Sequence, residues 1–481
     1  MKQLLLSAFI ALSLVSQAQY ENNYLQTTQI GSLNGDARFT GLGGAMSAVG
    51  SNFSALGNNP AGLAKFVNNE LNFGISILTN STDNLYNGTQ NNTFNGKLGI
   101  QSYGIAADIS SRNSEGQLWF SLSGQRVYDF KNRTIHKGRN IDYTLNEYLA
   151  DKAYGTFDSD LASVFPFDAS LAFETYLIDP DTVNYNTYTA KIQNEDARIE
   201  NDENGTRFEN YVSFGYNSNN KLYLGASVGI HSASYDNQYS YRGDNTNAET
   251  EYAQNYTYDY FFNSTSTGVN ATFGAIFKPS QVFNFGVSYK TPTAWYIEES
   301  FSSTMNAEYT NTEYTIDSEF EGAGIYRANS PSVFNFSAAV TDKQFGLFSV
   351  EASKINYSKG KLISPKREVF IDFDASNRAI STSFRDVWNI KAGYEKPFKR
   401  FALRAGINTI PSAYKNGNDF IDYRILNISG GLGIYTNFGR MDFSVTSSNA
   451  RSSIQPYSGA DLATTETRSL LFNFSFTILE L

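Results

Sequence analysis

Three charged residues are the side chains best placed for chemistry in this sequence. Glu351, Lys391 and Arg404 lie on three successive predicted strands, and the alternation of each strand puts the three side chains on one face. Neighbouring strands lie about 5 Å apart, so these charges can meet and can also reach Asp36 or Arg38 near the start of the chain. A structural network of ion pairs is the simplest interpretation, and a cation that meets a ligand carboxylate is the alternative.

Motifs of enzymes and metal sites are weak. Residues 225–229 match the Gly-x-Ser-x-Gly pattern of a hydrolase, but they lie inside an alternating strand instead of at a strand-to-helix turn. Residues 200–211 resemble the start of a calcium loop, but Tyr211 stands where that loop needs a glutamate. The chain has no cysteine, and its two histidines, His136 and His231, are isolated in the sequence. We therefore expect no enzymatic activity, no metal and no cofactor.

The composition favours a membrane β-barrel. The chain of 481 residues has 37 phenylalanines and 32 tyrosines, and such aromatic richness is typical of strands that face lipid on one side and water on the other. The formal net charge is −10 at pH 7. The chain therefore lacks the basic footprint that a nucleic-acid partner requires.

The first residues are expected to be a targeting segment. Lys2 precedes an apolar run at residues 4–15, and residues 16–18 end in a small side chain, which predicts a signal peptide over residues 1–18. No apolar stretch reaches the ~20 residues that a membrane helix needs. An exported chain without such a helix can enter a membrane only as a closed barrel, because unpaired backbone groups are too costly in hydrocarbon.

Residues 67–481 are predicted to form that barrel. We count roughly fourteen antiparallel strands, a number within the range of bacterial single-chain barrels. The links between consecutive strands alternate between short ones, such as 217–220, and long ones, of which 131–207 is the longest. Outer-membrane barrels have short periplasmic turns and long extracellular loops, so both chain termini are expected in the periplasm. A soluble β-sandwich or a solenoid is the alternative, and neither needs this asymmetry of loops.

The longest predicted loop carries a mixed helical stretch at 145–177 that is rich in apolar side chains. Loops in water seldom carry so many apolar groups unless they bury them together or use them. These side chains either form a capture site for a hydrophobic ligand or pack as the core of a lid, and a groove between such helices serves both roles. The candidate ligand-binding residues are Tyr148, Leu149, Phe157, Leu161, Phe165, Phe167 and Phe173.

The third predicted strand, at 118–130, loses its alternation. Leu118, Phe120 and Leu122 occupy one face, and Gly124 and Arg126 then follow at the same parity. A slip at a glycine indicates a kink or a bulge. We predict a kink of the barrel wall at Gly124, and an ordinary bulge above the membrane is the alternative.

A compact segment precedes the strands. Residues 36–66 are rich in glycine and alanine and lack strand alternation, and a short helix is expected at 45–56. A compact non-strand piece ahead of a long strand array predicts a plug inside the barrel. Residues 19–66 are therefore assigned to an N-terminal arm and this plug. The residues that mark it are Gly43, Gly44, Asn59, Pro60 and Ala61.

The order of these plug residues resembles the N-terminal hatch of the FadL-type long-chain fatty-acid transporters of outer membranes. Two barrel segments are similar to the same family: Phe-Gly-Ala-Ile-Phe-Lys-Pro at 273–279 leads to Gly-Val-Ser-Tyr-Lys-Thr-Pro at 286–292, and Leu-Arg-Ala-Gly stands at 403–406. The resemblance implies passive uptake of fatty acids and other hydrophobic molecules. It also implies an outer ligand site in the loop after the third strand, and an inward bend of the third strand that opens the wall.

The sequence therefore predicts an all-β protein, a transmembrane antiparallel barrel with a hatch in its lumen, in the bacterial outer membrane. Its predicted function is passive uptake of hydrophobic molecules such as long-chain fatty acids. The expected partners are outer-membrane lipid and lipopolysaccharide, a hydrophobic ligand, and the barrel-insertion machinery, which reads a last strand like that at 467–479. A monomer is expected, although the sequence does not give the oligomeric state. A scaffold barrel of a secretion system and a general porin are the alternatives.

Overall fold

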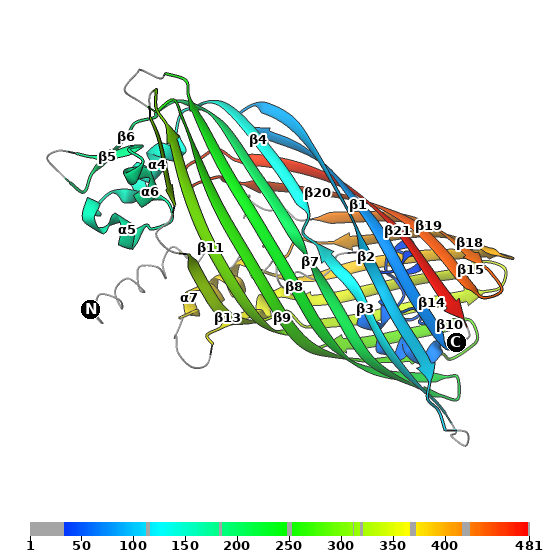
Figure 1. Cartoon of the computed structure of the whole chain (residues 1–481). Coiled ribbons are helices and arrows are strands. Elements are labelled where there is room, and N and C mark those ends of the chain that lie inside the picture. Colours follow the sequence, from blue (N-terminus) through cyan, green and yellow to red (C-terminus); the bar gives the residue numbers. More distant parts are fainter. Residues whose placement is uncertain are drawn as a thin grey trace.

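The protein is a closed β-barrel. The computed structural model describes residues 33–111, 116–181, 185–247, 253–310, 312–317, 321–365, 372–415 and 424–479. The predicted signal peptide and residues 19–32 of the predicted arm lie outside these described residues. Fourteen antiparallel strands make the wall, which closes because β1 pairs with β2 on one side and with β21 on the other (Figure 1).

The wall is built from consecutive antiparallel neighbours. Its strands are β1 (Glu70–Tyr86), β2 (Thr89–Asp108), β3 (Gln117–Asp129), β7 (Glu195–Ser218), β8 (Leu222–Asn245), β9 (Asn255–Phe277), β10 (Phe283–Lys290), β11 (Ala294–Glu308), β13 (Gly322–Asn329), β14 (Val333–Asp342), β15 (Gly346–Asn356), β17 (Asp386–Phe398), β18 (Phe401–Ile410), β19 (Ile425–Tyr435), β20 (Gly439–Ile454) and β21 (Ala463–Leu479).

Two strands of the wall are each interrupted once. β10 and β11 both pair with β9, and Pro292 lies between them. β14 pairs with β10 and β13 pairs with β11, and Pro331 lies between them. Proline has no N–H to give to the ladder, so each interruption falls where a proline enters the strand. Each of these two pairs of segments therefore counts as one wall strand.

The remaining elements lie inside the barrel or at one end of it. They are the strands β4 (Asn132–Ile141), β5 (Ile178–Pro180), β6 (Tyr188–Ala190), β12 (Glu313–Asp317) and β16 (Lys361–Ile363), the helices α3 (Ala37–Gly41), α4 (Leu145–Ala153), α5 (Leu161–Val164), α6 (Ala169–Glu174) and α7 (Asp374–Ser383), and the 3₁₀ turns η1 (Ser54–Gly57), η2 (Pro60–Lys65), η3 (Asp158–Asp160) and η4 (Tyr357–Lys359).

The predicted two-sided character of the strands is present on β1. Leu71, Phe73 and Ile77 point outward and are between 39% and 48% exposed, whereas Asn72 and Ser76 point into the barrel and are buried. A belt of such exposed apolar side chains is what a surface in contact with lipid requires. No helix in the described part of the chain is long and apolar enough to cross a membrane.

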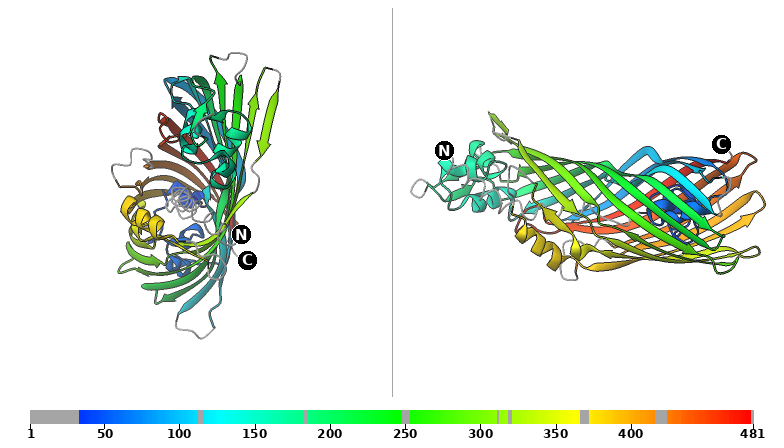
Figure 2. Two further views of the ribbon diagram at one scale, coloured as in Figure 1. Left: turned by 90° about the vertical axis from the view of Figure 1, so that its left-hand side faces the viewer. Right: turned by 90° about the horizontal axis from the view of Figure 1, so that it is seen from below.

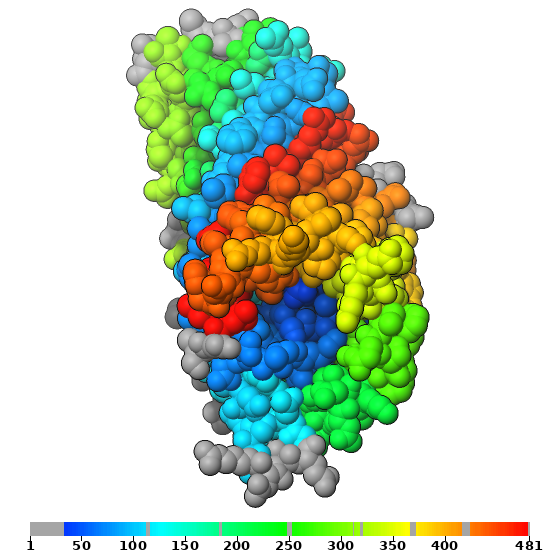
Figure 3. All heavy atoms as spheres, turned by 90° about the vertical axis from the view of Figure 1, so that its right-hand side faces the viewer, coloured from blue at the N-terminus to red at the C-terminus, as the bar shows by residue number. Residues whose placement is uncertain are grey.

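The two ends of the barrel differ. The links at one end are short, and the hatch segment, which we define as residues 33–66, lies inside the barrel there; Figure 3 shows its blue atoms filling the opening. At the other end the long strands β7, β8 and β9 project together with β4 and β11, and α4, α5 and α6 lie beside them (Figure 2). We call α4, α5, α6, β5 and β6 the cap. The predicted loop at 131–207 therefore begins and ends as strand, in β4 and in the first part of β7.

The hatch segment fits the lumen closely. Asn59 caps η2 by accepting from the Ala61 N–H at 3.1 Å. A Cβ added to Gly225 of β8 would lie 2.3 Å from the Ala61 nitrogen, so the wall and η2 touch through their backbones. The helix predicted at 45–56 is absent, and only η1 forms there, because Gly50 and Ser51 adopt φ values of 70° and 49° that interrupt a helix.

Candidate functional site

A cavity of about 520 Å³ lies in the lumen between the hatch segment and the long-loop end. Leu33 of the hatch segment, Tyr128 of β3, Thr134 of β4 and Ser448 of β20 are among its lining residues. A volume of this size falls within the range of ~300 to 1,000 Å³ that holds small organic ligands. The cavity is therefore the candidate ligand site of the barrel.

A second, smaller cavity of about 110 Å³ shares Leu33 and Asn34 with the first. Glu209 lines this cavity between two basic side chains. Its Oε1 is 2.7 Å from the Lys290 Nζ and 3.1 Å from the His231 Nε2. The sequence analysis missed Glu209 and Lys290. The alternation of their strands turns both side chains into the barrel, and this is the signal that could have predicted them. The same alternation turns His231 inward, so His231 is not isolated and lies beside Glu209.

The predicted luminal charges fall into two groups. Lys391 and Glu351 lie directly opposite each other and form an ion pair of 2.7 Å. The other Glu351 oxygen accepts from the backbone N–H of Ser47 at 3.2 Å, so this pair binds the hatch segment. Arg404 does not join them, because β18 places Asn408 opposite Lys391 and places Arg404 opposite Glu395.

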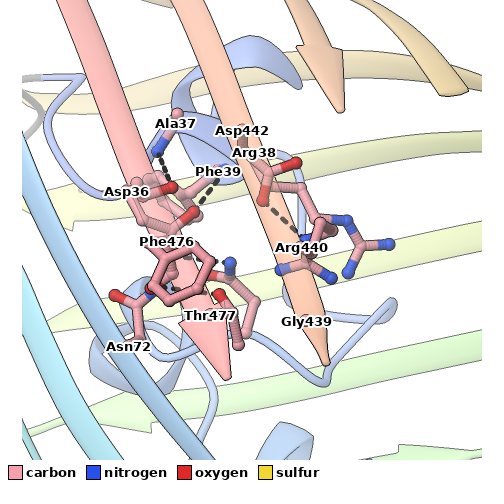
Figure 4. A network of polar contacts seen from close by, with 12 residues as sticks. Asp36, Ala37, Arg38, Phe39, Asn72, Gly439, Arg440, Asp442, Phe476 and Thr477 are labelled. Atoms are coloured by element: carbon pink, nitrogen blue, oxygen red, sulfur yellow. Dashed lines mark hydrogen bonds and ion pairs between the residues drawn. The ribbon is translucent and has the colours of Figure 1, made fainter. Parts of the chain in front are cut away.

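Arg404 belongs to a buried network that also holds the hatch segment. Its guanidinium contacts Glu395 at 2.5 Å and Asp442 at 2.8 Å. Arg38 of α3 pairs with the other Glu395 oxygen at 3.0 Å, and Arg440 pairs with Asp442 at 2.6 Å. Figure 4 shows Arg38, Arg440 and Asp442 gathered beside α3. Within each group, the charged side chains form ion pairs with one another.

The backbone ladder between β2 and β3 does not continue along the whole of β2. β2 pairs with β3 from Asp108 to Ser102, and above Ser102 it pairs with β1 alone within the described residues. β3 shifts its register on β7 between Arg126 and Tyr128, and β4 then continues along β7. We call the boundary between residues 89–101 of β2 and the β4–β7 pair the seam.

The kink predicted at Gly124 therefore begins slightly later. Gly124 pairs in regular register with Tyr103 of β2 and Asn210 of β7. The strand departs where Arg126 is drawn inward: its guanidinium is buried and pairs with Asp129 at 2.7 Å. The buried arginine, and not the glycine, marks the turn of the strand.

Side chains, and not the backbone, close the seam. Asn91 and Thr93 of β2 donate to the carbonyl oxygens of Ile135 and Arg133 at 2.6 and 2.7 Å. Lys97 reaches across to the carbonyl oxygen of Gly205 at 3.1 Å and to Asp129 at 3.4 Å. These groups replace the missing ladder bonds, because an unpaired strand edge at this position would be costly.

The predicted ligand-binding residues of the loop lie mostly within the cap. Leu149 and Leu161 are buried in one apolar cluster that also includes Tyr241 and Tyr256 of the wall strands. Four more of the predicted ligand-binding residues pack on this cluster or beside it, whereas Phe157 is 55% exposed. Those packed members are Tyr148, Phe165 and Phe173, with Phe167 against Phe301 at a ring separation of 4.8 Å.

A buried carboxyl group lies under the cap. Glu195 begins β7, where Arg198 and Glu200 on the other face show that this part of the strand stands outside the membrane. It accepts from the Tyr256 hydroxyl at 3.3 Å and from the Tyr241 hydroxyl. Burial raises the pKa of Glu195 to about 7, because the charged form is desolvated without a cation beside it.

Comparison with known proteins identifies the fold. Neither a protein-family model nor a curated protein matches the sequence. A crystal structure of a FadL homologue from Pseudomonas aeruginosa matches with a TM-score of 0.57 at 13% identity, covering 93% of this chain and 99% of that chain. The toluene transporter TodX of Pseudomonas putida matches with a TM-score of 0.53 at 12% identity, covering 93% and 99%. The chain therefore has the fold of the FadL-type channels.

Proposed function

We propose that the protein is an outer-membrane channel for the passive uptake of hydrophobic molecules. The observation that carries the proposal is the luminal cavity, which is closed below by the hatch segment and reaches the seam through Arg126, Asp129 and Lys131. A FadL homologue and a toluene transporter share the fold, which supports the same class of cargo. The lipid-facing belt and the cap at the long-loop end support an outer-membrane position with the short-turn end in the periplasm.

The physical need for such a device follows from the cargo. Each methylene group gains about 0.8 kcal/mol by leaving water, so a long alkyl chain gains on the order of 10 kcal/mol. A molecule of that kind does not favour an open aqueous pore. A sheltered route from an outer binding site to the membrane interior suits it better.

We infer a route in three steps. The cap receives the molecule near its apolar side chains, which include the exposed Phe157. The molecule then enters the luminal cavity, where the hatch segment blocks a straight passage to the periplasm. It leaves sideways through the seam when the bonds from Asn91, Thr93 and Lys97 break. Each of these bonds contributes about 1 kcal/mol net, and Asn80 and Thr82 of β1 add two more to the same segment, so opening breaks several weak bonds and no backbone ladder.

Reconstitution tests the proposal. The purified protein in liposomes is expected to admit labelled palmitate faster than empty liposomes do, and to exclude a labelled sugar of similar mass. Mass spectrometry of the detergent-purified protein is expected to find a bound apolar molecule. Entry of the sugar would instead support a general porin. A protein that is empty, transports neither solute and retains a protein partner would support a scaffold barrel.

A further inference from the structure

One wall of the larger cavity is a row of short polar side chains. Asn427 of β19 lies opposite Ser448 of β20, which lies opposite Ser469 of β21, which lies opposite Asn80 of β1. All four residues line the cavity. Four neighbouring strands thus present hydroxyl and amide groups at one height.

Some polar groups of this wall are buried and lack a partner. Asn427 is 3% exposed. Thr446, two residues before Ser448 on β20, is 1% exposed. Within the described chain, the Asn427 Nδ2 and the Thr446 Oγ1 have no hydrogen-bond partner. His136 of β4 also lines the cavity, with its Nε2 3.0 Å from the Thr465 hydroxyl and its Nδ1 without a partner there. Buried groups of this kind cost about 1 to 3 kcal/mol each until something bonds to them.

The rest of the lining mixes aromatic rings with further polar groups, which include Asn132 of β4 and Asn237 of β8. Two of the aromatic rings come from the end of β3 and the residue after it. They belong to Tyr128 and Phe130, which pack together at a ring separation of 4.8 Å. Tyr357 and Tyr414 add two more rings. Flat apolar surfaces of this kind suit a rigid hydrophobic molecule.

The charged groups of the lining already have partners. Arg126 pairs with Asp129 at 2.7 Å and Lys131 pairs with Asp202 at 2.8 Å. Glu203 accepts from the Tyr235 hydroxyl at 2.7 Å. The groups left to select a ligand are therefore neutral donors and acceptors, and the polar wall holds a row of them across four neighbouring strands.

We propose that this cavity selects a facially amphipathic ligand, namely a rigid, ring-containing hydrophobic molecule with hydroxyl or carbonyl groups along one side. The proposal rests on the proposed function and narrows its cargo. An unsubstituted alkyl chain would cover the Asn427 and Thr446 groups without bonding to them. A ligand with hydroxyl groups on one face satisfies those groups and places its apolar face on the aromatic rings. Sites built on hydrogen bonds discriminate strongly against analogues that lack the bonding group.

The test uses three probes and the protein in lipid nanodiscs. Cholate carries three hydroxyl groups on one face, lithocholate has the same rings and carboxylate with one hydroxyl group, and palmitate is an alkyl chain. We expect cholate to bind at least about tenfold more tightly than lithocholate. Partition into an apolar phase alone gives the opposite order, because lithocholate is the more hydrophobic of the two. Tighter or equal binding of lithocholate would overturn the inference.

A matched pair of variants assigns the preference to the wall. The double variant Asn427→Leu with Thr446→Val is expected to lose the cholate preference and to keep its affinity for palmitate. Ser447→Val changes the neighbouring residue on the lipid-facing side of β20 and is expected to keep the preference. Asn427→Ser, a smaller change, serves if the double variant does not fold, and it is expected to weaken cholate binding alone. An unchanged preference in folded variants would contradict the inference.

The two proposals fail differently. Binding and uptake of palmitate without any cholate preference would overturn the ligand class and leave the proposed channel standing. If none of the three probes binds or enters liposomes, the channel itself is wrong, and the inference that rests on it falls too.

Discussion

The hatch segment and the seam are held in different ways. Buried ion pairs fix the hatch segment, through Glu351 with Lys391 and through Arg38 with Glu395. Neutral side-chain bonds and the ammonium group of Lys97 close the seam. Removing one partner of a buried ion pair costs about 3 to 5 kcal/mol, whereas a single neutral bond contributes about 1 kcal/mol. A single neutral bond at the seam therefore costs less to break than one buried ion pair of the hatch segment.

The largest expected effect is at the hatch segment. Glu395→Gln leaves Arg38 and Arg404 without their shared carboxylate, so we expect the free energy of unfolding to fall by about 3 to 5 kcal/mol. Urea unfolding in a lipid bilayer measures it. Glu466→Gln is the matched control, because its partner Arg451 is exposed and such a pair contributes at most about 1 kcal/mol. Equal effects of the two substitutions would show that the buried ion pairs of the hatch segment contribute no more to stability than an exposed pair.

The cap provides a pH dependence. Since burial raises the pKa of Glu195 to about 7 from an ordinary 4.5, the folded cap is most stable below pH 4.5 and loses stability as the pH rises to about 7. The loss is on the order of 3 kcal/mol for the cap. Hydrogen exchange of α4 and α6 between pH 4.5 and 8 measures it, and Glu195→Gln is expected to flatten the profile. Protection that increases with pH would contradict this role of Glu195.

A tight backbone contact of the hatch segment gives a smaller effect. Gly43 has a φ of 61°, and an added Cβ would lie 2.7 Å from the backbone nitrogen of Ile407. Gly43→Ala is expected to destabilise the protein by about 1 to 3 kcal/mol, measured by the same unfolding assay. Gly88→Ala is the control, since Gly88 has a φ of 72° and open space around it. Gly88→Ala is expected to lower the free energy of unfolding only by the backbone strain of about 1 kcal/mol. If it lowers the free energy of unfolding as much as Gly43→Ala does, the contact with Ile407 is not the cause of the Gly43→Ala effect.

The smallest effect is expected at the seam itself. Lys97→Met removes the bonds to the Gly205 carbonyl oxygen and to Asp129, so the rate of palmitate entry into liposomes is expected to rise a few-fold while stability changes by about 1 kcal/mol. Lys221→Met, at the exposed short-turn end, is expected to leave the rate unchanged. A slower rate in Lys97→Met would show that Lys97 serves the passage of the ligand instead of closing the wall.

The sequence predicts the barrel well because alternation is a local property. Polar and apolar side chains of β1 alternate as the strand faces lipid and lumen, and the structure confirms the closed wall of fourteen strands. The inward positions of Glu351, Lys391 and Arg404 follow from the same parity. Their grouping does not, because the register between β17 and β18 sets Arg404 opposite Glu395 and away from Lys391.

Other features depend on packing that a single sequence does not contain. Glu395 lies close to the turn between β17 and β18, and its side chain stays inside the barrel because β17 continues to Phe398. The lost alternation of β3 is visible at Gly124, and the position of the kink is set by burial of Arg126. Whether the apolar residues of the loop face a ligand or one another depends on how α4, α5 and α6 pack, and Leu149 and Leu161 lie in the cap core.

Engineered disulfides test directly whether cargo leaves through the seam. The chain has no cysteine of its own. Thr93→Cys with Arg133→Cys is designed to lock the seam where the Thr93 hydroxyl donates to the Arg133 carbonyl oxygen. Thr40→Cys with Ser444→Cys, whose native hydroxyl groups lie 2.7 Å apart, is designed to lock the hatch segment to β20. Mass spectrometry verifies that each disulfide has formed before transport is measured. Asn306→Cys with Thr315→Cys, between β11 and β12 away from both, is the control. We expect oxidation to stop palmitate entry only in the seam pair, with recovery on reduction. Entry that continues through a locked seam and stops with a locked hatch segment would contradict the account.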